Sequence, residues 1–275
     1  MAQLAKLTPT IKGFLHRLSW VCLGLACLVL AGCAGISGRS TPAPLDPPVE
    51  ALISQLSRRN SDLKTFKASG RVAIHHKSQF KFNQTGLWAG LGRAKMRLTL
   101  LGIDGRPITS MVRDGKRLDL LFHPQDRLET LQIGESGLQR VTQIEFSPDT
   151  LAALLLGQIP VENYRTAEIV SAAGRGVLLA LKGRWGKTLQ RIYFTPDTRQ
   201  VQRIETYNAR GNLRYQADLG PPRTHDGFQI PSRIDIRNDQ DDRLSIEIQR
   251  YWPNAPLPEG IFSIEPATQG RAGPG

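Results

Sequence analysis

Cysteine is scarce in this chain, and its scarcity excludes several kinds of site. Three of the 275 residues are cysteines, and two of them, Cys22 and Cys27, lie in an N-terminal leader that we expect to be cleaved off. The mature chain then keeps Cys33 alone. Because no disulfide, redox CxxC pair or two-cysteine metal site is available, the exported domain must be stabilised by its core.

Histidine is also scarce, and the five histidines show no metal-ligand or catalytic spacing. His16 lies in the leader, while His75 and His76 are neighbours on a predicted strand, where their side chains point to opposite faces. His123 and His225 fall in predicted turns. Since ligand pairs need convergent spacing, we expect no metal site and no catalytic histidine.

Motifs of other chemistries are missing as well. The acidic run Asp239, Asp241 and Asp242 lacks the glycine and the distal glutamate of a calcium loop, and is typical of a hairpin turn. Gly90 and Gly92 form a GxG fragment between predicted strands, so they do not indicate a phosphate site at a helix start. The sequence contains no GxSxG nucleophile motif. We therefore expect a protein without enzyme activity and without a cofactor.

Long apolar runs are rare, and the strongest one is Leu18–Leu30. It follows Lys6, Lys12 and Arg17, and no acidic residue precedes Cys33. A helix that crosses a bilayer needs about 20 apolar residues, which is more than this run supplies. A basic leader followed by a short apolar region predicts a secretory signal peptide, and an uncleaved anchor helix is the alternative.

This run ends in the residues LAGC at 30–33, which resemble the lipobox of bacterial lipoproteins. In such proteins the cysteine thiol receives a diacylglyceryl group, and cleavage leaves that cysteine as the new N-terminus. We expect a signal peptide at 1–32, lipidation of Cys33 and a flexible linker at 33–48, because the linker residues are small, polar and rich in proline. Several acyl chains at one terminus anchor a protein firmly to a membrane surface.

Acidic residues are too few to balance the basic ones, and the formal net charge is +12. Cleavage would remove three positive charges and no negative one, which leaves +9. Export past a membrane and the lack of a nucleic-acid-binding motif argue against nucleic acid as a partner. A solvated basic surface and a patch for anionic lipid both stay open, and the basic residues are dispersed: Arg97, Arg113, Arg117, Arg191, Arg203 and Arg233.

Hydrophobic spacing divides the rest of the chain into helices and strands. Apolar residues recur at helical spacing from Val49 to Leu63, opposite a polar face. A second helix is predicted after Ser147, a good N-cap that precedes Pro148, and Gly157 can end it. Elsewhere the period is two, which is typical of antiparallel strands with one apolar face.

About eleven such strands at even spacing predict a mainly β fold, an incomplete and half-open antiparallel barrel with helices covering its concave face. The Asp114-Gly115 pair between two alternating runs predicts one of its hairpins. We assign this domain to residues 49–266, followed by a disordered C-terminal tail at 267–275.

The apolar faces of the first strands either pack against the helices or line a cavity for an apolar guest, and the sequence leaves both open. In the second case the lining residues share the inward face of three strands: Val72, Ile74, Phe80, Phe82, Trp88, Met96, Leu98 and Leu100. On the next strand the alternation selects Ile108, Ser110 and Val112.

Three stretches resemble the LolA/LolB lipoprotein-localisation family: DLKTFKASGRVAI at 62–74, RAKMRLTLLGIDGRPITSMVRDGKRLDLLF at 93–122 and PDTLAALLLGQIP at 148–160. The segment YWPNAPLPEGIFSIEPATQG at 251–270 is similar to the close of that superfamily. The likeness is greatest to the LolB type, the outer-membrane lipoprotein receptors. It implies an incomplete barrel closed by helices, whose interior accepts the acyl chains of lipoproteins without covalent chemistry or a bound cofactor.

The loop at 101–107 departs from this family pattern. LolB-like proteins carry an exposed leucine there that inserts cargo into the membrane, and Asp104 falls about where that leucine should be. The neighbouring Ile103 can take its place, and the alternative is a glycine-rich turn with one incidental apolar residue. Ala34, after the lipidated cysteine, is compatible with outer-membrane sorting in the family.

The resemblance implies a lipoprotein anchored through Cys33 on the periplasmic face of the outer membrane. It would bind the acyl chains of lipoproteins, receive them from a soluble periplasmic LolA-like carrier and insert them into the inner leaflet of the outer membrane. Two alternatives use the same fold. One is an envelope sensor or scaffold that binds a protein partner, and the other is a carrier for glycolipid or lipopolysaccharide.

Overall fold

The computed structural model of the chain describes residues 47–77, 79–115, 117–132, 138–172, 176–196 and 200–264. The predicted signal peptide, Cys33, the linker up to residue 46 and the tail at 267–275 lie outside the described residues. All described residues belong to one compact unit, which spans 42–275. None of the helices described here is both long enough and apolar enough to cross a membrane.

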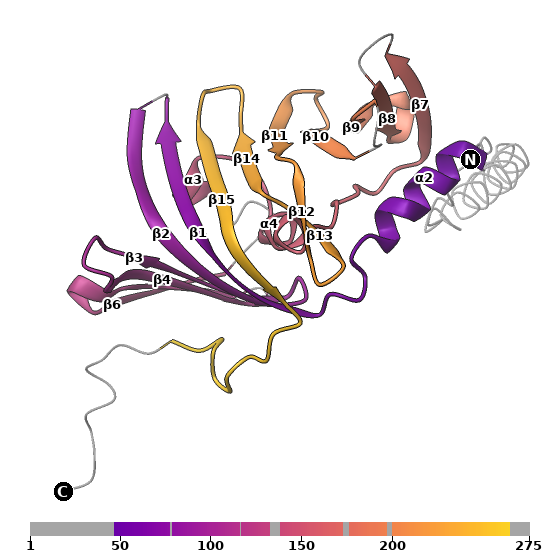
Figure 1. The fold of residues 1–275 in the computed structure, drawn as a ribbon. Helices are drawn as coiled ribbons and strands as arrows, with labels where there is room; N and C mark the ends of the chain where they lie inside the picture. Colours follow the sequence, from indigo (N-terminus) through magenta and orange to yellow (C-terminus); the bar gives the residue numbers. More distant parts are fainter. Residues whose placement is uncertain are drawn as a thin grey trace, which may run out of the picture. The chain divides into compact units, whose positions relative to one another are not determined.

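A thirteen-stranded antiparallel sheet dominates the fold, in the order β6-β5-β4-β3-β2-β1-β15-β14-β11-β10-β9-β8-β7 (Figure 1). A second, two-stranded sheet pairs β12 with β13. The strands are β1 (Thr65–His76), β2 (Gln79–Leu91), β3 (Lys95–Leu101), β4 (Pro107–Asp114), β5 (Arg117–Phe122), β6 (Arg127–Gln132), β7 (Thr166–Ala172), β8 (Gly176–Lys182), β9 (Thr188–Phe194), β10 (Val201–Tyr207), β11 (Leu213–Leu219), β12 (Pro222–His225), β13 (Phe228–Pro231), β14 (Arg233–Arg237) and β15 (Arg243–Pro253).

The large sheet curves strongly but does not close, because β6 and β7 stand at its two ends and do not pair in the described structure. This confirms the predicted half-open barrel. The predicted count of about eleven strands was too low, because the structure describes fifteen. The strands β12 and β13 have four residues each, too few for a period of two to be recognised.

A bulge in β15, opposite Ser69 and Gly70 of β1, helps the sheet to bend. The pairing of β1 with β15 shifts register between Ser69 and Gly70. A Cβ atom on Gly70 would lie 1.8 Å from the backbone oxygen of Glu247, so only glycine permits this close approach of the two strands. Bulges and strand glycines of this kind increase the local bend and twist of a sheet.

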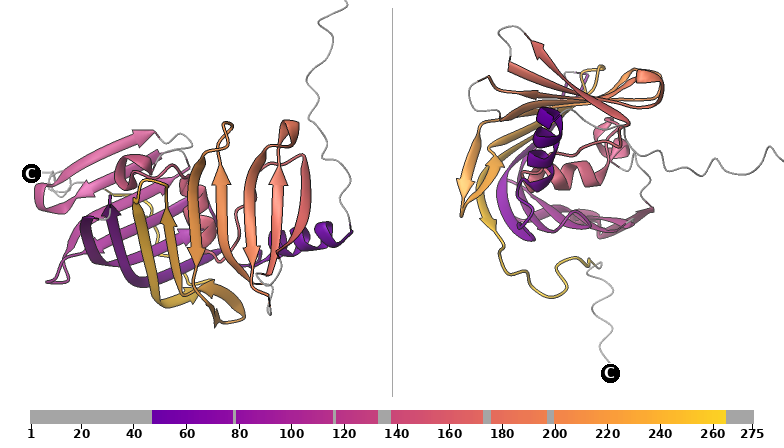
Figure 2. Two further views of the ribbon diagram at one scale, coloured as in Figure 1. Left: turned by 90° about the horizontal axis from the view of Figure 1, so that it is seen from above. Right: turned by 90° about the vertical axis from the view of Figure 1, so that its right-hand side faces the viewer.

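The helix α4 (Pro148–Leu155) lies within the curve of the sheet, and α2 (Pro47–Arg58) lies at the end of the sheet that carries β7 (Figure 2). Ser147 caps α4 as predicted, because its Oγ accepts a hydrogen bond from the Thr150 N–H at 3.1 Å. The first helix is shorter than predicted and ends at Arg58, and Leu63 is buried in the turn that leads into β1. The single-turn helix α3 (Gln139–Thr142) was not predicted.

Hydrogen bonds tie the end of α4 to its surroundings. Asn60 Nδ2 donates to the carbonyl oxygens of Leu156 and Gln229, each at 2.9 Å, and so joins α4 to β13. The Tyr251 hydroxyl of β15 donates to the carbonyl oxygen of Leu155 at 3.0 Å, and burial raises the pKa of that hydroxyl. Because these partners are buried or partly buried, α4 is held firmly against the sheet.

Candidate functional site

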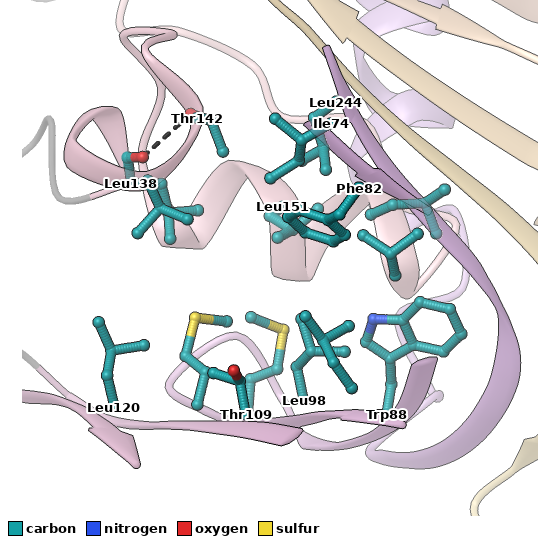
Figure 3. A pocket seen from close by; sticks show the side chains of 16 residues that line it. Ile74, Phe82, Trp88, Leu98, Thr109, Leu120, Leu138, Thr142, Leu151 and Leu244 are labelled. Atoms are coloured by element: carbon teal, nitrogen blue, oxygen red, sulfur yellow. Dashed lines mark hydrogen bonds between the residues drawn. The ribbon is translucent and has the colours of Figure 1, made fainter. Parts of the chain in front are cut away.

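An apolar cavity lies between the concave face of the first five strands and the helices α3 and α4 (Figure 3). Its volume is about 80 Å³. Apart from two threonines, its walls consist of aliphatic, aromatic and methionine side chains: Val72, Ile74, Phe82, Trp88, Met96, Leu98, Leu100, Thr109, Met111, Leu120, Leu138, Val141, Thr142, Leu151, Leu244 and Ile246.

The structure brings seven of the eight predicted lining residues together around this cavity: Val72, Ile74, Phe82, Trp88, Met96, Leu98 and Leu100. The side chain of the eighth, Phe80, lies outside the described part of the chain. The strand pairing explains the grouping, because Ile74 lies opposite Phe82, and Trp88 lies opposite Leu98. Lipid binding by these residues stays a prediction.

The prediction for β4 selected the wrong face. Met111 and Thr109 line the cavity, whereas Ser110 and Val112 point to the other side of the sheet. The two faces of β4 are hard to tell apart from the sequence, because each carries a buried apolar residue, Met111 on one and Val112 on the other. The hairpin between β4 and β5 could have indicated the correct face. Asp114 pairs with Arg117, and counting back from that pair places Met111 opposite Leu120, which lines the cavity.

The other missed residues come from segments far apart in the sequence. Leu138, Val141 and Thr142 belong to the segment around α3, and Leu244 lies on β15 opposite Ile74. The Thr142 hydroxyl is already used, because it donates to the carbonyl oxygen of Leu138 at 2.9 Å (Figure 3). No local pattern in the sequence indicates that these residues meet the first strands.

Trp88 contributes the one polar atom of this wall that is fully buried and has no hydrogen-bond partner among the described residues, its Nε1. None of the described residues that line the cavity has an ionisable side chain. Arg113 follows Met111 on the same face of β4, but its Nη2 pairs with Asp149 Oδ1 at 2.9 Å. The described part of the cavity wall therefore suits an apolar guest.

Four of the five histidines lie in the described part of the chain. Among the residues it describes, no three His, Cys, Asp or Glu side chains are placed to hold a metal ion. His76 Nδ1 lies 2.5 Å from Asp242 Oδ1 in the turn between β14 and β15. His123 Nε2 lies 2.9 Å from the Ser110 hydroxyl, and burial together with the nearby Arg97 guanidinium lowers the pKa of His123.

The predicted membrane-insertion residue, Ile103, lies in the turn between β3 and β4 with its side chain fully exposed at 105 %. Three hydrogen bonds hold the turn. The Gly102 N–H donates to the Arg106 carbonyl oxygen at 2.8 Å, the Gly105 N–H to the Gly102 carbonyl oxygen at 3.0 Å, and the Arg106 N–H to Asp104 Oδ1 at 3.1 Å. Ile103 is therefore exposed to solvent on a turn that hydrogen bonds hold in place. Its role at a membrane stays a prediction.

No family model matches the sequence, and no curated protein matches it. Solved structures do match the fold. A domain of an outer membrane lipoprotein-sorting protein from Vibrio parahaemolyticus is 12% identical, with a TM-score of 0.55 over 78% of this chain and 95% of that one. A LolA superfamily protein from Nitrosomonas europaea is 13% identical, with a TM-score of 0.51 over 78% of this chain and 97% of that one.

A DUF1329 family protein from Desulfovibrio piger is 10% identical to this chain, with a TM-score of 0.57 over 79% of this chain and 98% of that one. At these identities the likeness shows the fold alone. The chain has the open, strongly curved antiparallel sheet of LolA-like proteins.

Proposed function

We propose that this chain is a lipid-anchored receptor that takes the acyl chains of lipoproteins into the cavity beneath its first five strands. The observation that carries the proposal is the cavity wall, which is apolar over five neighbouring strands and is covered by α3 and by Leu151 of α4. Burial of apolar surface supplies the affinity, at about 0.8 kcal/mol for each buried methylene group. The LolA-like fold supports lipoproteins as the cargo.

The described cavity is the closed state of this receptor. Its volume of about 80 Å³ is below the range of about 300–1,000 Å³ typical of ligand pockets. The cover around α3 is the part that yields, because α3 has only four residues and its Val141 is 45 % exposed. Met96 and Met111 can adapt to the guest, since methionine side chains are flexible and fill irregular space.

The proposal also gives roles to the lipidated Cys33, the linker and the turn that carries Ile103. Cys33 carries the acyl anchor, and the linker lets the domain stand off the periplasmic face of the outer membrane. A soluble LolA-like carrier supplies the cargo, and transfer proceeds downhill in affinity without a covalent step or a cofactor. Ile103 contacts the inner leaflet during delivery. Its exposed apolar side chain lies on a turn held by hydrogen bonds, so it can insert into the leaflet without unfolding β3 and β4.

A transfer assay tests the receptor function. The unit 42–275, which lacks the anchor, is mixed with a carrier loaded with a radiolabelled lipoprotein, and the label is followed onto the unit and then into liposomes. We expect label on the wild-type unit and on a Leu87→Asp control, whose substitution lies on the outer face of β2. The absence of transfer to the wild-type unit would overturn the receptor function and leave the sensor or scaffold reading.

Delivery is tested separately with Ile103→Asp. This variant should accept label as the wild type does but pass less of it to liposomes, because a carboxylate at the tip resists entry into the leaflet. Trp185→Asp is the matched control, since Trp185 is 93 % exposed on the turn between β8 and β9. Equal delivery by the wild type and Ile103→Asp would remove Ile103 from the mechanism while leaving cargo binding in place.

A further inference from the structure

Trp88 carries a buried donor for which the described residues provide no acceptor. The residue is 3 % exposed, and its Nε1 has no hydrogen-bond partner among the described residues. In native structures the great majority of buried N–H groups are paired, so an orphan in a cavity wall needs an explanation. In Figure 3 the indole nitrogen lies on the side of the ring that faces Leu98 and the cavity.

The packing around Trp88 fixes the direction of this donor. Trp88 lies between Ala68 of β1 and Leu98 of β3 in the strand pairing. Gly86 makes room for the ring, because a Cβ atom at this position would lie 2.9 Å from Trp88 Cζ2 and 2.9 Å from Val72 Cγ2. The indole is therefore held with its N–H toward the cavity before any guest enters, and a donor placed in advance loses little freedom on binding.

The chemistry of the indole limits the guest group that can pair with it. An indole N–H only donates, so its partner must be an acceptor and cannot be an ammonium group. A carboxylate would leave a charge without a counter-ion in an apolar cavity, which is strongly unfavourable. A carbonyl oxygen with apolar substituents fits best, and the carbonyl that joins an acyl chain to its ester or amide is such a group.

We infer that Trp88 Nε1 donates a hydrogen bond to the ester or amide carbonyl of the bound acyl group, so that the cavity selects acyl chains over plain alkyl chains. This inference rests on the proposed acyl-binding function. Trp88 thereby fixes the depth of the guest, because the carbonyl marks where the chain begins. A hydrophobic wall alone gives affinity without such a register.

The test compares two guests that differ only in the carbonyl: a 1-monoacylglycerol and the 1-alkylglycerol ether of equal chain length. Affinity for the unit 42–275 is measured by calorimetry. We expect the wild type to bind the ester about fivefold more tightly than the ether, since one neutral hydrogen bond contributes a factor of this order. Replacing Trp88 by benzothienylalanine, which has the same shape with sulfur in place of N–H, should abolish the preference and leave the ether affinity unchanged.

A spectroscopic readout separates hydrogen bonding from packing. With a ¹³C-labelled ester carbonyl, the carbonyl stretch of the bound guest should shift to lower wavenumber in the wild type and not in the benzothienylalanine or Trp88→Phe variants. An ester preference that survives in both variants, or a wild type that binds both guests equally, would overturn the role of Trp88 and leave acyl binding intact. Failure of both guests to bind the wild type would overturn the acyl-binding function and the role of Trp88 together.

Discussion

The concave face of the sheet has two halves that differ in how they are filled. Beneath β8 to β11 the inward side chains are sealed, and Leu179, Leu181, Ile192 and Ile204 are each 0 % exposed. Beneath β1 to β5 the inward side chains line a cavity, and several of them, Phe82, Leu98 and Leu100 among them, are only partly buried. One sheet with one alternating pattern thus forms a solid core at one end and a hollow at the other.

The difference lies in the cover rather than in the strands. In the sealed half the segment leading into α4 fills the sheet, and the Phe146 ring packs edge-on to Tyr215 of β11 at 6.2 Å between centroids. In the hollow half the cover is the single turn of α3 together with Leu151 of α4. Beside α3, Asn238 Nδ2 donates to the Gln143 carbonyl oxygen at 3.2 Å. A sheet face becomes a core or a binding cavity according to what folds over it.

The largest expected effect separates the two halves by stability. Phe194→Ala in the sealed half should lower the free energy of unfolding by about 3–5 kcal/mol, because it leaves a void where Phe194 is 1 % exposed. Acyl binding by the folded variant should be unchanged. Urea unfolding and a binding titration below the unfolding transition check both parts, and weaker binding without lost stability would contradict the division into halves.

Leu98→Asp in the hollow half should show the opposite profile. A carboxylate in the apolar wall must be desolvated when the guest enters, so acyl affinity should fall by about thirtyfold, or about 2 kcal/mol. The loss of stability should be smaller than for Phe194→Ala, since Leu98 keeps partial solvent access. Calorimetric titration with a monoacylglycerol measures the effect, and a folded Leu98→Asp variant with wild-type affinity would show that the guest binds elsewhere.

Ser147→Ala tests the helix that contributes to both halves. Loss of the N-cap hydrogen bond to the Thr150 N–H should lower the free energy of unfolding by about 1 kcal/mol. Ser147→Asp is the matched control, because aspartate caps a helix equally well and should restore most of the stability. Thermal unfolding of the three proteins measures the effect, and equal stability of all three would show that the cap does not hold α4.

The smallest expected effect concerns the turn between β14 and β15, which joins the halves. Burial alone would raise the pKa of Asp242, but hydrogen bonds from Asn238, His76 and the Lys77 N–H outweigh it and hold that pKa below its ordinary value of 3.8. The stabilisation is therefore complete above pH 3.8 and is lost as the pH falls through the lowered pKa of the folded state.

Asp242→Asn should accordingly be less stable than the wild type at neutral pH, and the gap should narrow as the pH falls below 3.8. Urea unfolding of both proteins across this range gives the comparison. A gap that stayed constant with pH would show that the carboxylate charge does not stabilise the turn.

Sequence patterns could predict which side chains of the first three strands point inward, but not which segments pack over them. The alternation of Val72, Ile74, Phe82 and Leu98 depends on neighbours along one strand, and the structure brings these residues together. The cover around α3 depends on contacts between segments far apart in the chain, which no period records. For the same reason the sequence left a packed core and a cavity equally open. On β4, whose two faces are both covered, the alternation selected the face that points away from the cavity.

The most direct test of acyl binding in the cavity uses its two methionines. The chain has three methionines, of which Met96 and Met111 line the cavity and Met1 lies in the predicted leader. In the unit 42–275 with ¹³C-labelled methionine methyl groups, the NMR signals are those of Met96, Met111 and the added initiating methionine, which serves as the control.

A nitroxide-bearing monoacylglycerol is titrated into this unit. An acyl chain in the cavity should broaden the signals of Met96 and Met111 to saturation, leave the control signal sharp and allow recovery with unlabelled monoacylglycerol. Unchanged signals from Met96 and Met111 at saturating lipid would contradict the binding of acyl chains beneath the first five strands.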